Sequence, residues 1–320
     1  MSGRKDVTKE DWIKTFSTLR SHHIDAVLIY GDKKEDILSL IPLANREGLE
    51  IHHWFRSLEC VDEEIMNEHP DWFTVSRNGD SSLDKPPYIP QYKWLCPTKP
   101  EVREYMVNRV SDSAETDGLT GVHLDYIRYI DVILPVGLQA KYNLVQDKEY
   151  PEYDFCYCPT CREAFKEKEG IDPFDLPDPT KSEAWRQFRY DSLTQLVNRC
   201  AEAVHKKNKK ITAAVFPSPD IARRLVRQDW PKWNLDGVLP MMYHKYYNEG
   251  VDWIKKVTAE GKKELPANIP LYSGLHIAML KPAELPFAGT NALKGGADGI
   301  VLFTGWAMTD EHWKQLIKVI

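Results

Sequence analysis

Short apolar segments alternate with longer amphipathic segments along the whole chain, and this alternation restricts the fold more than any other feature. The apolar runs have the composition of buried strands, and they cover residues 25–31, 49–58, 121–125, 211–217, 238–244, 271–277 and 299–306. The segments with helical spacing are 11–20, 35–47, 98–110, 160–169, 180–204 and 309–320. Strands that alternate with helices in this way predict a parallel α/β architecture.

A barrel fits this alternation better than a doubly wound sheet. A doubly wound sheet typically has a glycine-rich phosphate-binding turn after its first strand, and residues 30–34 (Tyr-Gly-Asp-Lys-Lys) do not match one. Eight strands would close a barrel, and the chain shows seven. We therefore predict a single (β/α)8 TIM barrel over residues 1–320. Its first strand is either missing, through truncation, or irregular within residues 3–8, and an insertion covers about residues 130–180.

The charge and hydropathy exclude two kinds of partner. The net charge is −6, and the one basic run, at 206–210, has the pattern of a solvated helix end. We therefore do not expect the protein to bind nucleic acid. No apolar run approaches the roughly 18 residues of a membrane span. The first six residues lack the apolar core of a signal peptide, so we favour an exported protein only if a leader has been removed.

The segment 118–129 (Gly-Leu-Thr-Gly-Val-His-Leu-Asp-Tyr-Ile-Arg-Tyr) carries the strongest functional signal. Side chains alternate along a strand, so Gly121, His123 and Asp125 share one face. Barrels of this kind place catalytic groups at the C-terminal ends of their strands, where Asp125 lies. The alternative is that Asp125 caps a turn or pairs with Arg128. We predict a catalytic or substrate-binding role for Asp125.

Several segments together resemble the family-10-like group of glycoside hydrolases, a set of TIM-barrel proteins. The matching segments are 69–72 (His-Pro-Asp-Trp), 94–105 (Trp-Leu-Cys-Pro-Thr-Lys-Pro-Glu-Val-Arg-Glu-Tyr), 121–129, 236–243 and 299–306. The resemblance implies a (β/α)8 barrel, a carbohydrate substrate and a central role for Asp125. It also implies that Asp125 ends the fourth strand of the barrel and that the first strand is missing.

Glycoside hydrolysis normally needs a second carboxyl group, and the sequence offers several. We prefer Glu59, which follows a strand next to that of Asp125 in chain order, and Asp220 is the second choice. Weaker candidates are Asp32, Glu35 and Glu249. Each of these loop carboxylates could instead be solvated or cap a helix. The late strands end in Tyr243-His244, His276 and Trp306, where many barrel glycosidases carry a Glu, and this departure argues against a standard two-Glu mechanism.

The predicted substrate-binding residues lie at or near strand ends. They are Arg128, Tyr126, His123, Trp54, Trp94, Tyr243, His244, His276 and Trp306. Trp306 is the best candidate for a stacking floor beneath a sugar ring. Arg128 would orient a carboxylate or bind an acidic sugar, or else pair with Asp131 or Asp125. His123 could instead be a core histidine with satisfied hydrogen bonds.

Three cysteines form a CxCxxC cluster in the insertion. Cys156, Cys158 and Cys161 would need a fourth ligand for tetrahedral zinc, and Cys96 or a nearby His could supply it. A disulfide to Cys96 and free thiols are the alternatives. Cys60 and Cys200 are expected to be buried and inert.

We predict a glycoside hydrolase that acts on an oligo- or polysaccharide, with Asp125 as proton donor or nucleophile. Its catalysis would need no cofactor, and any zinc would be structural. One alternative is a non-catalytic carbohydrate-binding barrel, which the lack of an obvious second carboxylate favours. A metal-assisted hydrolase ranks last, because no HExxH-type pair is present.

Overall fold

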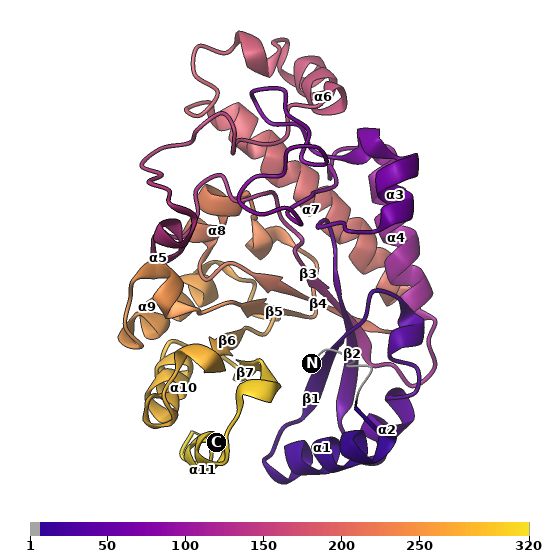
Figure 1. The fold of residues 1–320 in the computed structure, drawn as a ribbon, viewed down its shortest axis with the longest axis vertical. Helices are drawn as coiled ribbons and strands as arrows, with labels where there is room; N and C mark the ends of the chain where they lie inside the picture. The colour runs from indigo at the N-terminus through magenta and orange to yellow at the C-terminus, as the bar shows by residue number, and fades with distance from the viewer. Residues whose placement is uncertain (1–6, 320) are drawn as a thin grey trace.

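The computed structural model describes residues 7–319, whose strands run parallel around a barrel (Figure 1). Strands β1 (Ala26–Tyr30), β2 (Glu50–Arg56), β3 (Gly121–Asp125), β4 (Lys210–Val215) and β5 (Gly237–Pro240) pair in that order. Strands β6 (Tyr272–His276) and β7 (Gly299–Phe303) form a second parallel pair. Single parallel bridges, Val238 with Leu271 and Met241 with Gly274, join β5 to the β6 segment. The predicted order of strands is confirmed.

Helices connect the strands and also occur within the longer loops. They are α1 (Lys9–Ser21), α2 (Ile41–Arg46), α3 (Glu63–Glu68), α4 (Pro100–Ala114), α5 (Val136–Gln139), α6 (Pro159–Glu169), α7 (Glu183–His205), α8 (Pro219–Val226), α9 (Asp252–Glu264), α10 (Leu285–Lys294) and α11 (Asp310–Leu316). On α4, Val102, Met106 and Val110 recur at helical spacing and are all fully buried in one core with Val122 and Leu124 of β3. Burial of this apolar area is the main force that holds helices and strands together.

In the described part of the chain, the first strand, β1, does not pair with the last strand, β7. Helices α1 and α11 contribute the contacts between the two ends of the chain. All five residues of β7 are partly exposed. The Trp12 ring of α1 contacts the Trp306 ring beyond β7, with centroids 5.7 Å apart, and His22 contacts Trp313 of α11 at 4.6 Å. The strand that we predicted within residues 3–8 lies outside the described residues, apart from Val7 and Thr8, which lead into α1.

Two predicted elements are shorter than expected. The predicted helix at 35–47 is a 3-10 turn (Lys34–Asp36) followed by the short helix α2, because Pro42 has no N–H and can occupy only a first helical turn. The predicted strand at 238–244 ends at Pro240, since the chain then turns into a 3-10 helix (His244–Tyr247).

The two longest connections after strands lie together at the end of the barrel that carries Asp125. Residues 57–99 follow β2, and residues 126–182 follow β3 and contain α5 and α6. An antiparallel bridge between Ser76 and Phe155 joins them, and Figure 1 shows both above the sheet. This pair of loops forms one wall of the barrel mouth.

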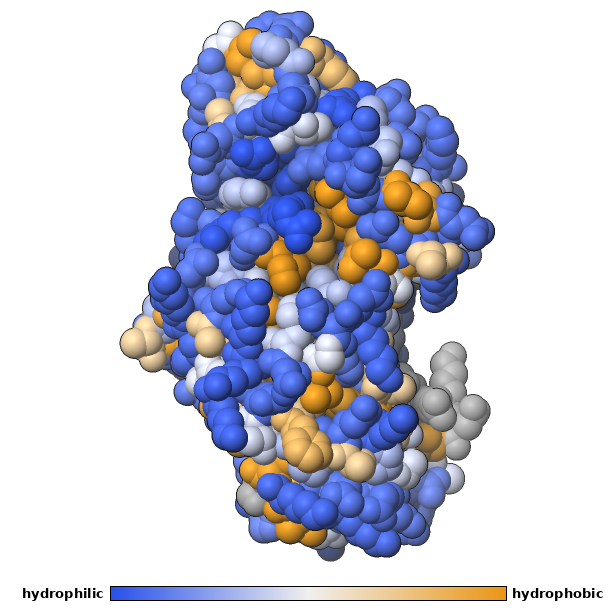
Figure 2. Space-filling model, turned by 90° about the vertical axis from the view of Figure 1, so that its left-hand side faces the viewer, coloured by the Kyte–Doolittle hydropathy of each residue, from blue (hydrophilic) through white to orange (hydrophobic). Residues whose placement is uncertain are grey.

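The side of the molecule seen in Figure 2 is mostly hydrophilic, with apolar residues in separate patches. Within residues 7–319 no helix is both long and apolar enough to cross a membrane.

Candidate active site

The register of the strands places the predicted site residues in two layers inside the barrel. Tyr30 pairs with Trp54, Trp54 with His123, and His123 with Thr212, so these residues form one layer across β1 to β4. One step closer to the C-terminal ends of the strands, Arg56 pairs with Asp125. Side chains two residues apart point to the same side of a strand, so Arg56 lies above Trp54 and Asp125 above His123. The upper layer is the mouth of the barrel.

Asp125 is half-buried and accepts a hydrogen bond on each carboxylate oxygen. Trp54 Nε1 donates to Oδ2 at 3.1 Å, and the backbone N–H of Tyr126 donates to Oδ1 at 2.7 Å. The second bond needs a sharp turn after β3, and Tyr126 makes it with a left-handed φ of 53°. Burial raises the pKa of Asp125, while these two donors and the charges of Arg128 and Arg56 act in the opposite direction.

Glu59 lies three residues beyond the end of β2, and the charge of Asp125 acts on its carboxyl group. Its side chain is almost fully buried, and its backbone bridges to Trp94 across the loop. Its carboxylate forms an ion pair with Arg56 at 3.6 Å. Burial raises the pKa of Glu59, and the charge of Asp125 raises it further, whereas Arg56 and Arg128 lower it. The mouth therefore holds two carboxyl groups, and the charges of the same two arginines lower the pKa of each.

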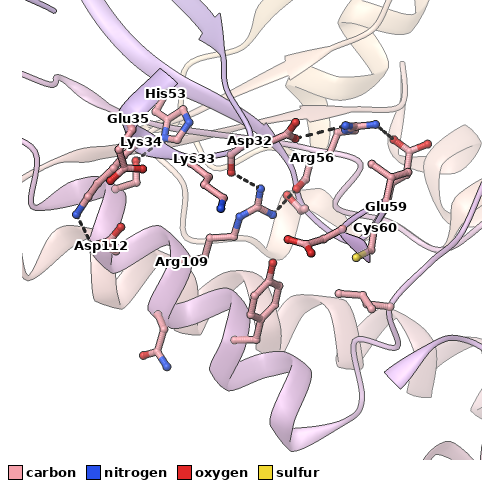
Figure 3. Close-up of a pocket in the computed structure, with 17 residues that line it drawn as sticks. Asp32, Lys33, Lys34, Glu35, His53, Arg56, Glu59, Cys60, Arg109 and Asp112 are labelled. Atoms are coloured by element: carbon pink, nitrogen blue, oxygen red, sulfur yellow. Dashed lines mark hydrogen bonds and ion pairs between the residues drawn. The ribbon is translucent and has the colours of Figure 1, made fainter. Parts of the chain in front are cut away.

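A cavity of about 530 Å³ opens beside Glu59 (Figure 3). Figure 3 shows Arg56 extended between Asp32, after β1, and Glu59. Arg109 of α4 donates to the backbone carbonyls of Arg56 at 2.7 Å and of Asp32 at 3.0 Å, which fixes the two strand ends against the helix. Asp125 does not line this cavity, but Arg56 and Glu59 line it and also interact with Asp125.

Aromatic rings from five strand ends lie on the same side of the barrel as Asp125. The Trp54 ring lies edge-on to Tyr30 at 5.4 Å and to Phe303 at 6.0 Å. Phe303 stacks on Tyr243 at 5.7 Å, and His276 lies edge-on to Tyr243 at 4.9 Å. Burial and the nearby charge of Asp125 raise the pKa of Tyr243 well above its usual value, so its hydroxyl stays protonated and can donate a hydrogen bond. Flat, amphipathic rings of this kind suit a sugar ring.

Three of the predicted substrate-binding residues are buried, and for His123 this agrees with the alternative of a core histidine. Trp94 is fully buried, and its Nε1 donates to the carbonyl of Arg128 at 2.6 Å. His123 bonds to Thr212 through Nδ1 at 2.8 Å, and burial lowers its pKa to about 3. His244 is buried in the 3-10 helix after β5. Their role in binding a sugar stays a prediction.

Three other predicted residues lie away from the carboxyl pair or have another partner. Trp306 packs against Trp12 of α1, so Phe303 takes the position expected for a stacking ring at this strand end. Asp220 is exposed in the first turn of α8 and, in the described contacts, meets neither Asp125 nor Glu59. Arg128 is buried and pairs with Asp131 at 2.8 Å, as the alternative interpretation held, while its charge still acts on both carboxyls.

Arg56 and Phe303 belong to the site but were not predicted from the sequence. Strand alternation could have found Arg56, because it lies two residues after Trp54 on the same face. Nothing local distinguishes Phe303 from any other apolar residue that ends a buried strand.

Four cysteines from two loops meet in the core above the barrel, as the sequence suggested. The sulfur atoms of Cys96, Cys156, Cys158 and Cys161 all lie within 4.8 Å of one another, and all four residues are buried. This cluster could hold a metal ion. Cys60 and Cys200 lie outside the cluster as buried free thiols.

The fold and the acidic mouth define a class: a parallel β/α barrel with a TIM-barrel architecture and paired carboxyl groups at the ends of its strands. Within that class, the chain belongs to the family described as glycosyl hydrolase-like 10, whose model matches residues 20–285. This confirms the family that the sequence motifs suggested. A comparison with curated proteins found no match.

Solved structures of glycosidases share the fold. The glycoside hydrolase domain of PgaB (BpsB) from Bordetella bronchiseptica matches with a TM-score of 0.68 and 11% identity, over 95% of this chain and 91% of that one. A β-galactosidase from Marinomonas ef1 gives 0.65 and 12%, over 99% of this chain and 57% of its own. A class V chitinase from Pseudomonas fluorescens gives 0.52 and 13%, over 98% and 97%. At these identities the similarity shows the fold.

Proposed function

We propose that the protein hydrolyses glycosidic bonds in an oligo- or polysaccharide and that Asp125 and Glu59 are its catalytic carboxyl groups. The observation that carries the proposal is the presence of both groups at the barrel mouth, where Asp125 is half-buried, Glu59 is almost fully buried, and burial raises the pKa of each. Glycoside hydrolysis needs one carboxyl group protonated and the other ionised, and a raised pKa on one of two neighbouring carboxyl groups favours the protonated one.

The hydrogen bonds favour negative charge on Asp125 and a proton on Glu59. Both oxygens of Asp125 accept N–H donors, which stabilise the carboxylate and oppose the rise in pKa that burial causes. Glu59 is more deeply buried, and the neighbouring negative charge of Asp125 favours its neutral form. In this assignment Glu59 protonates the leaving oxygen, and Asp125 acts as base or nucleophile. Arg56 holds Glu59 in place and offsets part of the negative charge.

The rings of Trp54, Tyr243, His276 and Phe303 would bind the sugar on which this pair acts. Burial lowers the pKa of His276, so its imidazole is neutral and can donate or accept hydrogen bonds with sugar hydroxyls. The chemistry needs only two carboxyl groups and water, so no cofactor takes part in it. An exported location stays a prediction of the sequence.

The test is hydrolysis of a broad glycan panel by the wild type, Asp125→Asn and Glu59→Gln, with Asp220→Asn as a matched control at an exposed carboxylate. Each exchange keeps the side-chain shape and removes the titratable group. Asp125→Asn should fall to background on every substrate. Glu59→Gln should lose about 10²–10⁴-fold on natural glycans, the range of general acid catalysis, and much less on aryl glycosides, whose leaving groups need no proton.

Thermal melting and near-UV circular dichroism check that each variant folds. Equal activity of Asp125→Asn and wild type would contradict the proposal, as would an equal loss in Asp220→Asn. Tight binding of a glycan without cleavage, unchanged in Asp125→Asn, would establish the carbohydrate-binding barrel instead.

A further inference from the structure

The four sulfur atoms above the barrel have the spacing of a tetrahedral thiolate site. With a Zn–S distance of about 2.3 Å, ligand sulfurs in a tetrahedron lie about 3.8 Å apart. Cys96 Sγ lies 3.7 Å from Cys158 Sγ and 3.4 Å from Cys161 Sγ, and every pair of the four is within 4.8 Å. A disulfide would need about 2.05 Å between two sulfurs. The arrangement therefore suits a bound ion better than a covalent pair.

The surroundings of the cluster offer the donors and charges that such an ion would require. Four thiolates around Zn²⁺ carry a net negative charge, which in a buried place needs compensation. The backbone N–H of Val75 donates to Cys156 Sγ at 3.3 Å, and that of Cys158 donates to the same sulfur at 3.4 Å. Lys99 lies within electrostatic range of Cys158 and Cys96, and Arg103 within range of Cys96 and Cys161.

An unpaired hydroxyl points to the same conclusion. Tyr129 is fully buried, and its hydroxyl makes no hydrogen bond of normal geometry among the described residues, although Thr98 lies close enough to affect its pKa. The same group interacts electrostatically with Cys161, Cys96 and Cys156. Leaving a buried hydroxyl unpaired destabilises the folded protein, and a zinc-bound thiolate would accept a hydrogen bond from it.

We propose that Cys96, Cys156, Cys158 and Cys161 bind one Zn²⁺ as four thiolates and that the ion locks together the two loops that form one wall of the barrel mouth. Binding releases the four thiol protons to solvent and forms four Zn–S bonds, with no change of oxidation state. Soft thiolates in a tetrahedron select zinc over harder divalent cations. The metal site does not rest on the proposed hydrolytic activity.

The cluster is connected to the carboxyl pair through short segments of chain. Cys96 follows Trp94 by two residues, and the Trp94 ring covers the guanidinium of Arg128 at 4.8 Å. Tyr129 follows Arg128 directly, and Arg128 acts electrostatically on both Asp125 and Glu59. An ion that fixes Cys96 and orients Tyr129 would therefore hold Arg128 from both sides.

The experiment measures metal in the protein purified under reducing conditions without an affinity metal. Mass spectrometry of the digested protein should find about one zinc per chain in the wild type and in Cys200→Ser, a matched buried thiol outside the cluster. Cys158→Ser combined with Cys161→Ser should fall to background. Stripping the wild type and adding Co²⁺ should produce the thiolate charge-transfer and d–d bands of a tetrahedral site, and refolding with zinc should raise Tm relative to refolding without it.

Several results would overturn the proposal. They are a metal-free wild type that gives no thiolate bands with Co²⁺, iron in place of zinc, and disulfide-linked peptides among these four cysteines after alkylation. If the double variant does not fold, the Co²⁺ titration and the refolding comparison on the wild type decide alone. Asp125→Asn should keep its zinc, so failure of the hydrolase proposal and failure of the metal proposal are distinguishable.

Discussion

At the scale of single residues, Trp54 illustrates how a residue predicted for one role can have another. The sequence placed it at the mouth as a sugar-binding ring, and the structure places its Nε1 on the carboxylate of Asp125. A hydrogen bond from a neutral donor to a charged acceptor stabilises the ionised form by about 1.5–3 kcal/mol in general. Trp54 is therefore positioned to set the charge of Asp125 as well as to offer a ring face.

We predict that Trp54→Phe raises the pKa of Asp125 by about one unit or more, since each unit corresponds to about 1.4 kcal/mol. Loss of the donor destabilises the carboxylate, and Asp125 then protonates at higher pH. If Asp125 must be ionised for catalysis, the acidic limb of the kcat/KM profile should move to higher pH by the same amount. Trp306→Phe, at a tryptophan whose ring packs against Trp12 of α1, is the control and should leave that limb in place. An acidic limb that stays in place in Trp54→Phe would contradict this role.

At the scale of elements, the first helix and the end of the last strand stabilise each other. Trp12 of α1 is buried at 3% exposure, where its ring contacts Phe16 at 5.3 Å and Trp306 at 5.7 Å. The core that contains Trp12 also includes Val27 and Ile29 of β1 and packs against Trp313 of α11. These contacts connect the two ends of the chain although β1 and β7 do not pair in the described residues.

We expect Trp12→Ala to lower the free energy of unfolding by about 3–5 kcal/mol, the usual cost of removing a buried Trp or Phe side chain. Urea unfolding followed by circular dichroism measures this change. Phe287→Ala, an aromatic residue 66% exposed on α10, is the control and should change stability by less than about 0.5 kcal/mol. Similar small losses in both variants would show that the two chain ends do not support each other.

Local sequence pattern predicted the elements better than the partners of their side chains. Apolar runs located each described strand to within a few residues, and the alternation of side chains along a strand placed Asp125 at the barrel mouth. Both predictions depend only on neighbours in the chain. The path of residues 57–99 depends on contacts with residues 126–182, far along the chain. The alternation of side chains along a strand therefore could not show that Trp94 is buried against Arg128, nor that Glu59 forms an ion pair with Arg56.

At the scale of the whole molecule, buried histidines connect stability to pH. His53 Nδ1 bonds to the Ser113 hydroxyl at 2.7 Å, and Nε2 donates to the Gly31 carbonyl at 3.0 Å, so Nε2 carries a proton. Burial lowers the pKa of His53 to about 4 and that of His123 to about 3, from an ordinary value of 6.5. Between these values the unfolded chain binds more protons than the folded protein does.

The free energy of unfolding should therefore decrease as pH falls through the window from 6.5 to about 4, with each of these histidines contributing a slope of about 1.4 kcal/mol per pH unit. The raised pKa values of Asp125 and Glu59 act in the opposite direction, because these groups take up protons more readily in the folded protein. Comparing wild type with His53→Gln cancels that opposing contribution and isolates one histidine. Urea unfolding at several pH values in this window should show a shallower slope for His53→Gln, by about 1.4 kcal/mol per unit, whatever its stability at neutral pH. Parallel curves would mean that His53 takes up its proton in the folded protein as readily as in the unfolded chain, and that burial does not hold the ring neutral.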